Sequence, residues 1–131
     1  MTFTARCCCR ACEVVVDGDA FINAVCHCQN CKRRTGSAFG WSAYFGDPQI
    51  ASVTGDLRTY ENPARGQTRS FCANCGTTLF WVSENAPGVT GFAGGCFEDP
   101  PLPEPTATAE PHQRCAWVGL PETWAVWPPR D

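Results

Sequence analysis

Residues 67–84 read QTRSFCANCGTTLFWVSE, and this stretch places a CxxC motif between two β-like runs. Both runs are rich in aromatic and β-branched residues, a composition typical of strands. The turn between Cys72 and Cys75 lets two thiolates share one metal ion, and Gly76 allows the tight backbone behind them. We predict two strands joined by a metal-binding knuckle.

Further β-like segments flank this stretch at the short spacing of an all-β domain. They cover residues 12–19, 20–25, 37–47, 49–56, 57–62 and 88–97. Residues 28–36 instead favour a turn and a short helix that ends at Gly36. The expected fold class is therefore mainly β, with little helix.

Eleven of the 131 residues are cysteines, and the formal net charge is −3. The chain starts without an apolar export signal, and it contains no apolar run long enough to cross a membrane. This cysteine density therefore argues for metal or redox chemistry in a cytoplasmic protein rather than for disulfides. The acidic balance argues against general nucleic-acid binding, which needs a basic face.

Seven cysteines occur at metal-ligand spacing, in three groups. These are the first pair (Cys7, Cys9), the cysteine triad (Cys26, Cys28, Cys31) and the CxxC pair (Cys72, Cys75). These seven cysteines could be grouped into metal sites in two ways. In one, the last two cysteines of the triad and the CxxC pair form a single zinc ribbon. In the other, the first pair and the CxxC pair form a closed four-cysteine site, and the triad forms a separate three-ligand site.

The other cysteines lack a spaced partner and are expected to be small buried residues. They are Cys8, Cys12, Cys96 and Cys115. His27 follows Cys26 on extended backbone and is expected to face the opposite side, where it serves packing or proton transfer.

The C-terminal third differs in composition, although we expect a single domain over residues 1–131. Five of the twelve residues in 100–111 are proline, which predicts an extended surface strap that is poorly able to join a sheet. The tail 112–131 carries Trp117, Trp124 and Trp127, and we expect it to pack back on the domain.

The cysteine motifs and their neighbours resemble the glutathione-dependent formaldehyde-activating enzyme (GFA) family, also called centromere-protein-V-like. The matching segments are CHCQNCKRRTGSAF (26–39), VTGDLRTYE (53–61), RSFCANCGTTLFW (69–81) and GGCFEDP (94–100). The resemblance implies an Mss4-like β-tent, in which antiparallel sheets hang from zinc knuckles. It also implies that Cys7, Cys9, Cys72 and Cys75 form a structural Zn²⁺ site, and that the cysteine triad forms a second, catalytic zinc site.

The activity implied by the resemblance is a carbon–sulfur lyase reaction, in which a small thiol such as glutathione adds to formaldehyde or a related aldehyde. The open zinc position would take the substrate thiol, and a three-ligand site is expected to be only partly occupied by metal. Lys32, Arg33 and Arg34 would receive the glutathione carboxylates. The open side should face a cleft near Trp41, Tyr44 and Glu98. No nucleic acid or membrane is expected as a partner, and the protein should be a monomer or a homodimer.

Two other functions fit the sequence. One is a non-catalytic Mss4-like interaction or chaperone module that binds zinc. The other is a methionine sulfoxide reductase of the B type, which requires a cysteine outside the zinc sites, with Cys96 or Cys115 as candidates.

Overall fold

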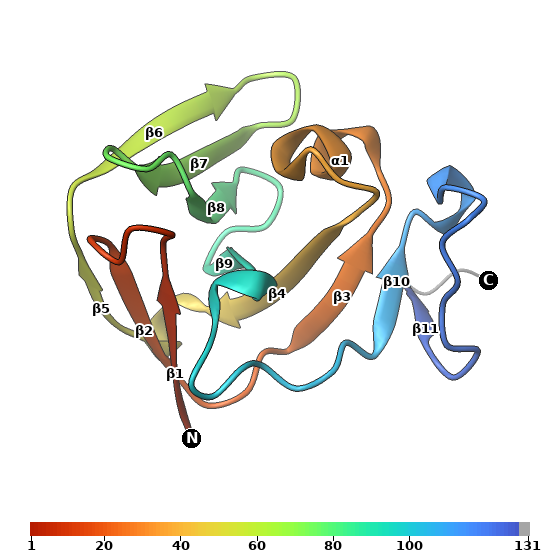
Figure 1. Ribbon diagram of the computed structural model, residues 1–131, viewed down its shortest axis with the longest axis horizontal. Helices are drawn as coiled ribbons and strands as arrows, with labels where there is room; N and C mark the ends of the chain where they lie inside the picture. The colour runs from red at the N-terminus through yellow and green to blue at the C-terminus, as the bar shows by residue number, and fades with distance from the viewer. Residues whose placement is uncertain (129–131) are drawn as a thin grey trace.

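The computed structural model describes residues 1–128, which form two β-sheets, one short α-helix and three 3-10 helices (Figure 1). The 3-10 helices are η1 (Asp47–Gln49), η2 (Gly94–Cys96) and η3 (Pro111–Gln113). The smaller sheet has the order β1-β2-β5. Its strands are β1 (Thr2–Arg6), β2 (Glu13–Asp17) and β5 (Ile50–Thr54). All its neighbouring strands are antiparallel. This sheet carries the N-terminus and covers one side of the larger sheet.

The larger sheet has eight strands in the order β11-β10-β3-β4-β9-β8-β7-β6. Its strands are β3 (Ile22–Cys26), β4 (Gly40–Gly46), β6 (Leu57–Asn62), β7 (Gln67–Cys72), β8 (Thr78–Ser83), β9 (Val89–Ala93), β10 (Ala107–Ala109) and β11 (Ala125–Trp127). Across the sheet from β3 through β4, β9, β8 and β7 to β6, neighbouring strands are antiparallel. Strand β10 instead runs parallel to both of its neighbours, β3 and β11. The mainly β fold predicted from the sequence is confirmed.

The single α-helix, α1 (Gln29–Thr35), follows β3 directly. Cys28 is its N-cap, and Gly36 ends it in the left-handed conformation with φ of 64°, which glycine adopts without steric cost. The predicted short helix is therefore confirmed. No helix within residues 1–128 is long and apolar enough to cross a membrane.

The hydrophobic core lies between the two sheets. Along β1 and β2, buried side chains alternate with partly or fully exposed ones, because successive residues of a strand face opposite sides. The core includes Phe3, Val14, Val16, Phe45, Leu79, Phe92 and Phe97. The Phe45 and Phe92 rings meet edge to face at 5.6 Å, a favourable arrangement for aromatic pairs. Cys7 and Cys72 belong to the same buried cluster. The core therefore holds one cysteine of the first pair and one cysteine of the CxxC pair in place.

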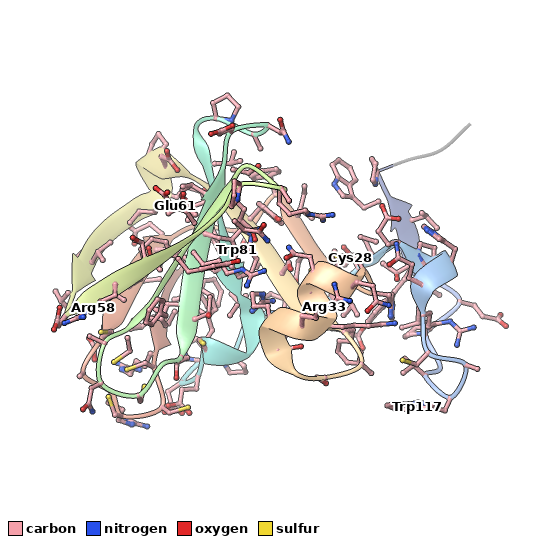
Figure 2. All side chains as sticks on the ribbon, turned by 90° about the horizontal axis from the view of Figure 1, so that it is seen from above. Cys28, Arg33, Arg58, Glu61, Trp81 and Trp117 are labelled. Carbon is pink, nitrogen blue, oxygen red and sulfur yellow. The ribbon has the colours of Figure 1, made fainter. Side chains whose placement is uncertain are left out.

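The proline-rich segment joins the large sheet, contrary to the expectation that it would stay out of it. Residues 107–109 form β10 and pair with β3, with Thr108 opposite Val25. The segment's prolines all lie outside these three residues, so no backbone donor is missing from the ladder. The tail returns through β11, but the Trp117 side chain is 79% exposed and lies at the edge of the molecule (Figure 2). Residues 129–131 lie outside the described part of the chain.

Candidate metal centres and active-site cleft

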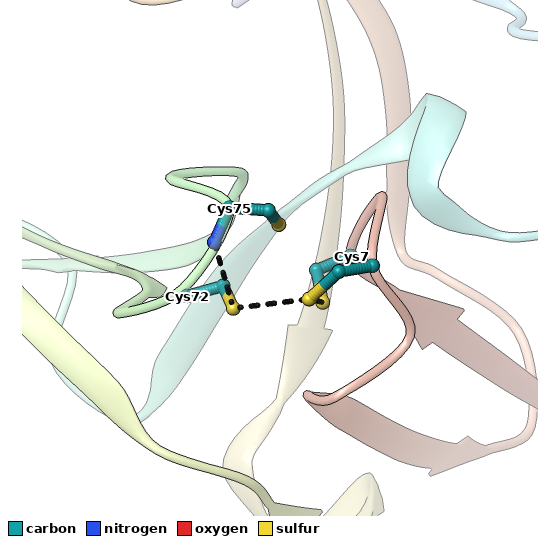
Figure 3. Close-up of side chains that lie close together, drawn as sticks. Cys7, Cys72 and Cys75 are labelled. Atoms are coloured by element: carbon teal, nitrogen blue, oxygen red, sulfur yellow. Dashed lines mark hydrogen bonds between the residues drawn. The ribbon is translucent and has the colours of Figure 1, made fainter.

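Four cysteines converge where the turn after β1 meets the turn after β7 (Figure 3). The sulfurs of Cys7, Cys9, Cys72 and Cys75 all lie within 4.8 Å of one another. The Cys7–Cys9 and Cys9–Cys72 sulfur distances are 3.6 and 3.7 Å. Tetrahedral zinc with Zn–S bonds of ~2.3 Å separates its sulfurs by ~3.8 Å. These four cysteines therefore fit a closed zinc site.

Backbone N–H groups around this closed site point at the sulfurs. Cys12 N–H donates to Cys7 Sγ at 3.3 Å, and Cys75 N–H donates to Cys72 Sγ at 3.5 Å. The hydrogen bond between Cys75 and the Thr77 hydroxyl lowers the pKa of Cys75 to about 5. Such bonds favour the thiolate, which is the form that binds a metal.

The cysteine triad forms a second, separate group at the end of β3. Cys26 is the last residue of β3, Cys28 caps α1, and Cys31 lies in the first turn of α1. Their sulfurs lie within 4.8 Å of one another, and no further His, Cys, Asp or Glu of residues 1–128 joins the group. The structure thus forms the closed four-cysteine group and the separate triad, and not the zinc ribbon.

The three triad sulfurs lie close enough to shift one another's pKa values. Hydrogen bonds from Cys26 and Cys31 lower the pKa of Cys28 to about 2. The same hydrogen bonding raises the pKa values of Cys26 and Cys31. Cys28 Sγ also accepts from the backbone N–H of Cys31 at 3.4 Å. A metal ion bound here would replace these shared protons, since metal binding requires thiolates.

The triad lines a cleft of about 960 Å³. Strands β3 and β4, helix α1, the loop between β6 and β7 and the loop between β8 and β9 all contribute to its walls. The lining includes Asn30, Arg34, Ser42, Tyr44, Arg65 and Trp81. This combination of apolar walls and a few polar groups is typical of a small-molecule site. The predicted cleft beside the triad is therefore present.

Arg34 supplies a cation inside this cleft. Its guanidinium carbon lies 4.3 Å from the centroid of the Trp81 ring, a cation–π distance. Its Nη2 is buried without a hydrogen-bond partner among the described residues. A Cβ at Gly40 would lie 2.7 Å from Nη2, so glycine is what allows the guanidinium to lie against β4. Burial lowers the pKa of Arg34, and the neighbouring Cys31 acts in the opposite direction.

Tyr44 and Trp81, which both line the cleft, meet over Gly91 of β9. The Trp81 indole N–H donates to the Tyr44 hydroxyl at 3.2 Å, and the rings meet edge to face. Gly91 pairs with both residues across the sheet. A Cβ there would lie 2.2 Å from Trp81 Nε1 and 2.9 Å from Tyr44 Cε1. Burial raises the pKa of the Tyr44 phenol, which keeps it protonated at neutral pH.

Asn30 connects helix α1 to the opposite wall of the cleft through hydrogen bonds. Its Oδ1 accepts hydrogen bonds from Asn62 and Arg69, and its Nδ2 donates to Gln67. These three partners belong to the hairpin of β6 and β7. The loop of that hairpin places Arg65 Nη2 3.9 Å from Cys28 Sγ, which adds a second cation beside the thiolate.

The structure separates the three predicted substrate-binding cations. Arg34 lines the cleft, whereas Lys32 and Arg33 are not among its lining residues. Lys32 Nζ donates to the backbone carbonyl of Gln113 at 2.6 Å, and Arg33 is exposed on the outer face of α1 (Figure 2). The lysine thus ties the helix to the C-terminal segment.

Of the three side chains predicted to face the cleft, only Tyr44 does so, and the prediction is wrong for the other two. Trp41 lies on the opposite face of β4, where its indole N–H donates to Asn23 at 2.7 Å. Glu98 pairs with Arg10 at 2.8 Å. Sequence reasoning missed Arg65 and Trp81, because only the folded sheet brings them to the triad. It also missed Asn30, which lies between Cys28 and Cys31 in the sequence but meets its hydrogen-bond partners only in the fold.

His27 and the remaining cysteines lie outside the cleft lining. The His27 side chain is fully buried against Phe39, without a hydrogen-bond partner among the described residues. Burial lowers its pKa, which favours the neutral ring. Cys12 is buried as expected, whereas Cys8 is exposed, and Cys96 and Cys115 are half-buried.

Comparison with known proteins supplies an independent indication of family. The sequence pattern described as "Glutathione-dependent formaldehyde-activating enzyme" matches residues 2–115. A crystal structure of a Rhodobacter sphaeroides protein from a structural genomics programme superposes with a TM-score of 0.60 and 22% sequence identity. The alignment covers 73% of this chain and 88% of that chain, which shows a shared fold. A search of curated proteins gives no match.

The matched region spans both cysteine groups, helix α1 and most of the cleft. Each cysteine group could hold a metal ion, and the chain belongs to the glutathione-dependent formaldehyde-activating enzyme family.

Proposed function

We propose that this protein catalyses the addition of a small thiol of the glutathione type to formaldehyde or a related small aldehyde, and the reverse carbon–sulfur cleavage. The observation that supports it best is the contrast between the two cysteine groups. Four cysteines close one group, whereas three form the other, and these three line a cleft large enough for a tripeptide-sized ligand. Three protein ligands and one open position are typical of catalytic zinc.

We propose zinc as the metal at both groups, with Cys7, Cys9, Cys72 and Cys75 holding a structural ion and the triad holding the second. Zinc at the triad would supply a site where a thiol loses its proton at neutral pH. The protein itself would orient the thiol in the cleft and hold the aldehyde next to its sulfur.

Arg34 is the cation that we propose for binding a carboxylate of the thiol substrate. It is held by Trp81 inside the cleft, beside Cys31. A charge-assisted hydrogen bond to a carboxylate contributes ~1.5–3 kcal/mol. Loss of it should weaken binding by about 10- to 100-fold.

The function is tested by measuring the exchange between formaldehyde and S-(hydroxymethyl)glutathione by NMR, with zinc-loaded protein and with buffer alone. We expect the protein to raise the exchange rate above the spontaneous rate. An unchanged rate, with zinc bound at both groups, would contradict the proposal and favour a non-catalytic zinc module.

Arg34→Gln tests the role of the cleft cation. We expect the KM for glutathione to rise at least tenfold, because the carboxylate loses its partner, with a much smaller rise for the uncharged thiol 2-mercaptoethanol. Arg58→Gln removes an exposed cation that does not line the cleft (Figure 2), so it controls for the change in net charge. An equal effect of Arg34→Gln on both thiols would exclude carboxylate binding by Arg34.

A further inference from the structure

The Tyr44 hydroxyl is a hydrogen-bond donor whose proton has no partner among the described residues. Its oxygen accepts the Trp81 indole N–H at 3.2 Å. Trp81 can only donate in this bond. The phenolic O–H of Tyr44 therefore keeps its own proton for a group in the cleft that it lines.

The surrounding rings hold this hydroxyl in place. Gly91 leaves room for Tyr44 and Trp81 to meet above β9, and the two rings cross at 81°. On its other side, Tyr44 packs against Phe21 at 6.4 Å between ring centroids. A donor that is fixed before the substrate arrives requires no reorganisation during the reaction.

Strand β4 carries this hydroxyl on the same face as the triad. Gly40, Ser42 and Tyr44 alternate along β4 and so share one face of the sheet. At one end of this row, a Cβ on Gly40 would lie 3.1 Å from Cys31 Cβ. The triad, Ser42 and Tyr44 all line the same cleft. An aldehyde held next to a sulfur at the triad would therefore share this cleft with the phenol.

Thiol addition to an aldehyde needs a proton donor close to the aldehyde oxygen. A C–S bond forms between the thiol sulfur and the carbonyl carbon, and the π electrons of the C=O bond move to the oxygen. That oxygen must gain a proton to give the hydroxymethyl product. The thiol's own proton is released before the attack, so it is not available at the oxygen.

We propose that Tyr44 is the catalytic acid that donates its phenolic proton to the aldehyde oxygen, and that Trp81 positions it for this step. This inference rests on the proposed function. The Tyr44 O–H bond breaks as the new O–H bond forms, and the phenolate regains a proton from water in the open cleft. In the reverse direction, the phenolate takes the proton from the hydroxymethyl group, so atoms and charges balance without any oxidant or reductant.

Tyr44→Phe tests the proposal, because it removes the hydroxyl and keeps the ring. Loss of a general acid costs about 10²- to 10⁴-fold in rate. We expect kcat for S-(hydroxymethyl)glutathione formation to fall at least about 100-fold, with the KM for glutathione changed less than about threefold. The control is Tyr60→Phe. Tyr60 is the chain's other tyrosine, and it is 50% exposed on β6 outside the cleft. It should keep the parent rate.

Trp81→Phe separates positioning from proton donation, because it keeps a ring beside Arg34 but removes the N–H that orients Tyr44. We expect an intermediate fall in kcat of roughly tenfold. Zinc content and melting temperature of each variant should match those of the parent, which shows that the site is intact.

A Tyr44→Phe protein with the parent kcat would overturn the proposal. A Tyr44→Phe protein in which only the KM for glutathione changes would also overturn it. A Trp81→Phe variant with the parent kcat would overturn the positioning role. A parent protein that leaves the spontaneous rate unchanged would overturn the proposed function, and this inference with it. The parent rate therefore shows which of the two has failed.

Discussion

At the scale of single residues, glycines decide where the cleft side chains lie. Gly91 lets Tyr44 and Trp81 meet across β9, and Gly40 lets Arg34 lie against β4. Neither glycine is at a positive φ, so their role is to leave space, not to form a turn. A glycine of this kind has no sequence signature, because the residues that need the space come from other strands. The contact between Tyr44 and Trp81 could therefore not be predicted from the sequence.

Gly91→Ala should destabilise the protein by about 1–3 kcal/mol, because the new methyl group would displace the Trp81 indole from a packed position. Urea denaturation measures this change. Gly95→Ala is the matched control, since a Cβ there would meet nothing within 4 Å. Equal stability of the two variants would show that Trp81 moves aside without cost.

Two buried threonines of the large sheet differ in their hydrogen bonding. Thr90 Oγ1 donates to Asp47 Oδ1 at 2.8 Å, whereas Thr108 Oγ1 is buried without a partner among the described residues. Thr90→Val should cost about 1 kcal/mol, because it leaves Asp47 with one bond fewer. Thr108→Val should be neutral or stabilising, since it removes an unsatisfied hydroxyl. Thermal unfolding of both variants measures the difference, and an equal loss of stability would contradict this assignment.

At the scale of elements, helix α1 and the β6–β7 hairpin both contribute to the walls of the cleft beside the triad. The β7–β8 pair and its CxxC knuckle could be predicted because their strand composition and turn lie in one continuous stretch, residues 67–84. The contact between the β6–β7 hairpin and α1 could not be predicted, because it depends on polar side chains with no spacing rule. Asn30 makes this contact, and the hairpin partners Asn62, Gln67 and Arg69 share it.

Asn30→Ala should loosen the β6–β7 hairpin without unfolding the sheet. It removes three hydrogen bonds that dock the hairpin on α1, and each contributes ~0.5–1.5 kcal/mol. Amide hydrogen exchange should therefore become faster in β6 and β7 and remain unchanged in β3 and β4. Uniformly faster exchange would mean that Asn30 stabilises the whole domain instead.

The C-terminal strands are the elements that the sequence analysis did not predict. Proline density around residues 100–111 indicated a surface strap, yet three residues without proline suffice for β10 to pair with β3. The N-terminal β1 was also missed, because Phe3 is the one large apolar residue within Thr2–Arg6. Short strands of this kind form through tertiary contacts, which override weak local propensity.

At the scale of the whole molecule, the two cysteine groups lie in different surroundings. The closed group joins the smaller sheet to the β7–β8 turn and includes Cys7 and Cys72 from the core. The triad lies at the end of β3, beside the cleft. Spacing alone identified the ligand candidates, but it left two groupings open, because only the fold determines which cysteines meet.

Cys72→Ser and Cys28→Ser should therefore have different effects. Cys72→Ser removes a ligand from the closed site, where metal binding is coupled to folding, so we expect a large fall in melting temperature and poor solubility. Cys28→Ser should stay folded, retain about one zinc per chain instead of about two, and lose thiol-dependent activity. Zinc analysis and thermal unfolding of both variants test this, and equal collapse of both would mean that the triad is structural.

The parallel pairing of β10 with β3 has a consequence for how the chain folds. Thr108 pairs with Val25, and the backbone N–H of His27 donates to the carbonyl of Ala109. A contact between such distant parts of a sequence forms late, because a long loop must close first. During synthesis on a ribosome, the edge of β3 therefore stays unpaired until residues 107–109 have emerged. Until then, the nascent protein carries an open strand edge beside the three thiols of the triad, and the pairing of β10 covers that edge.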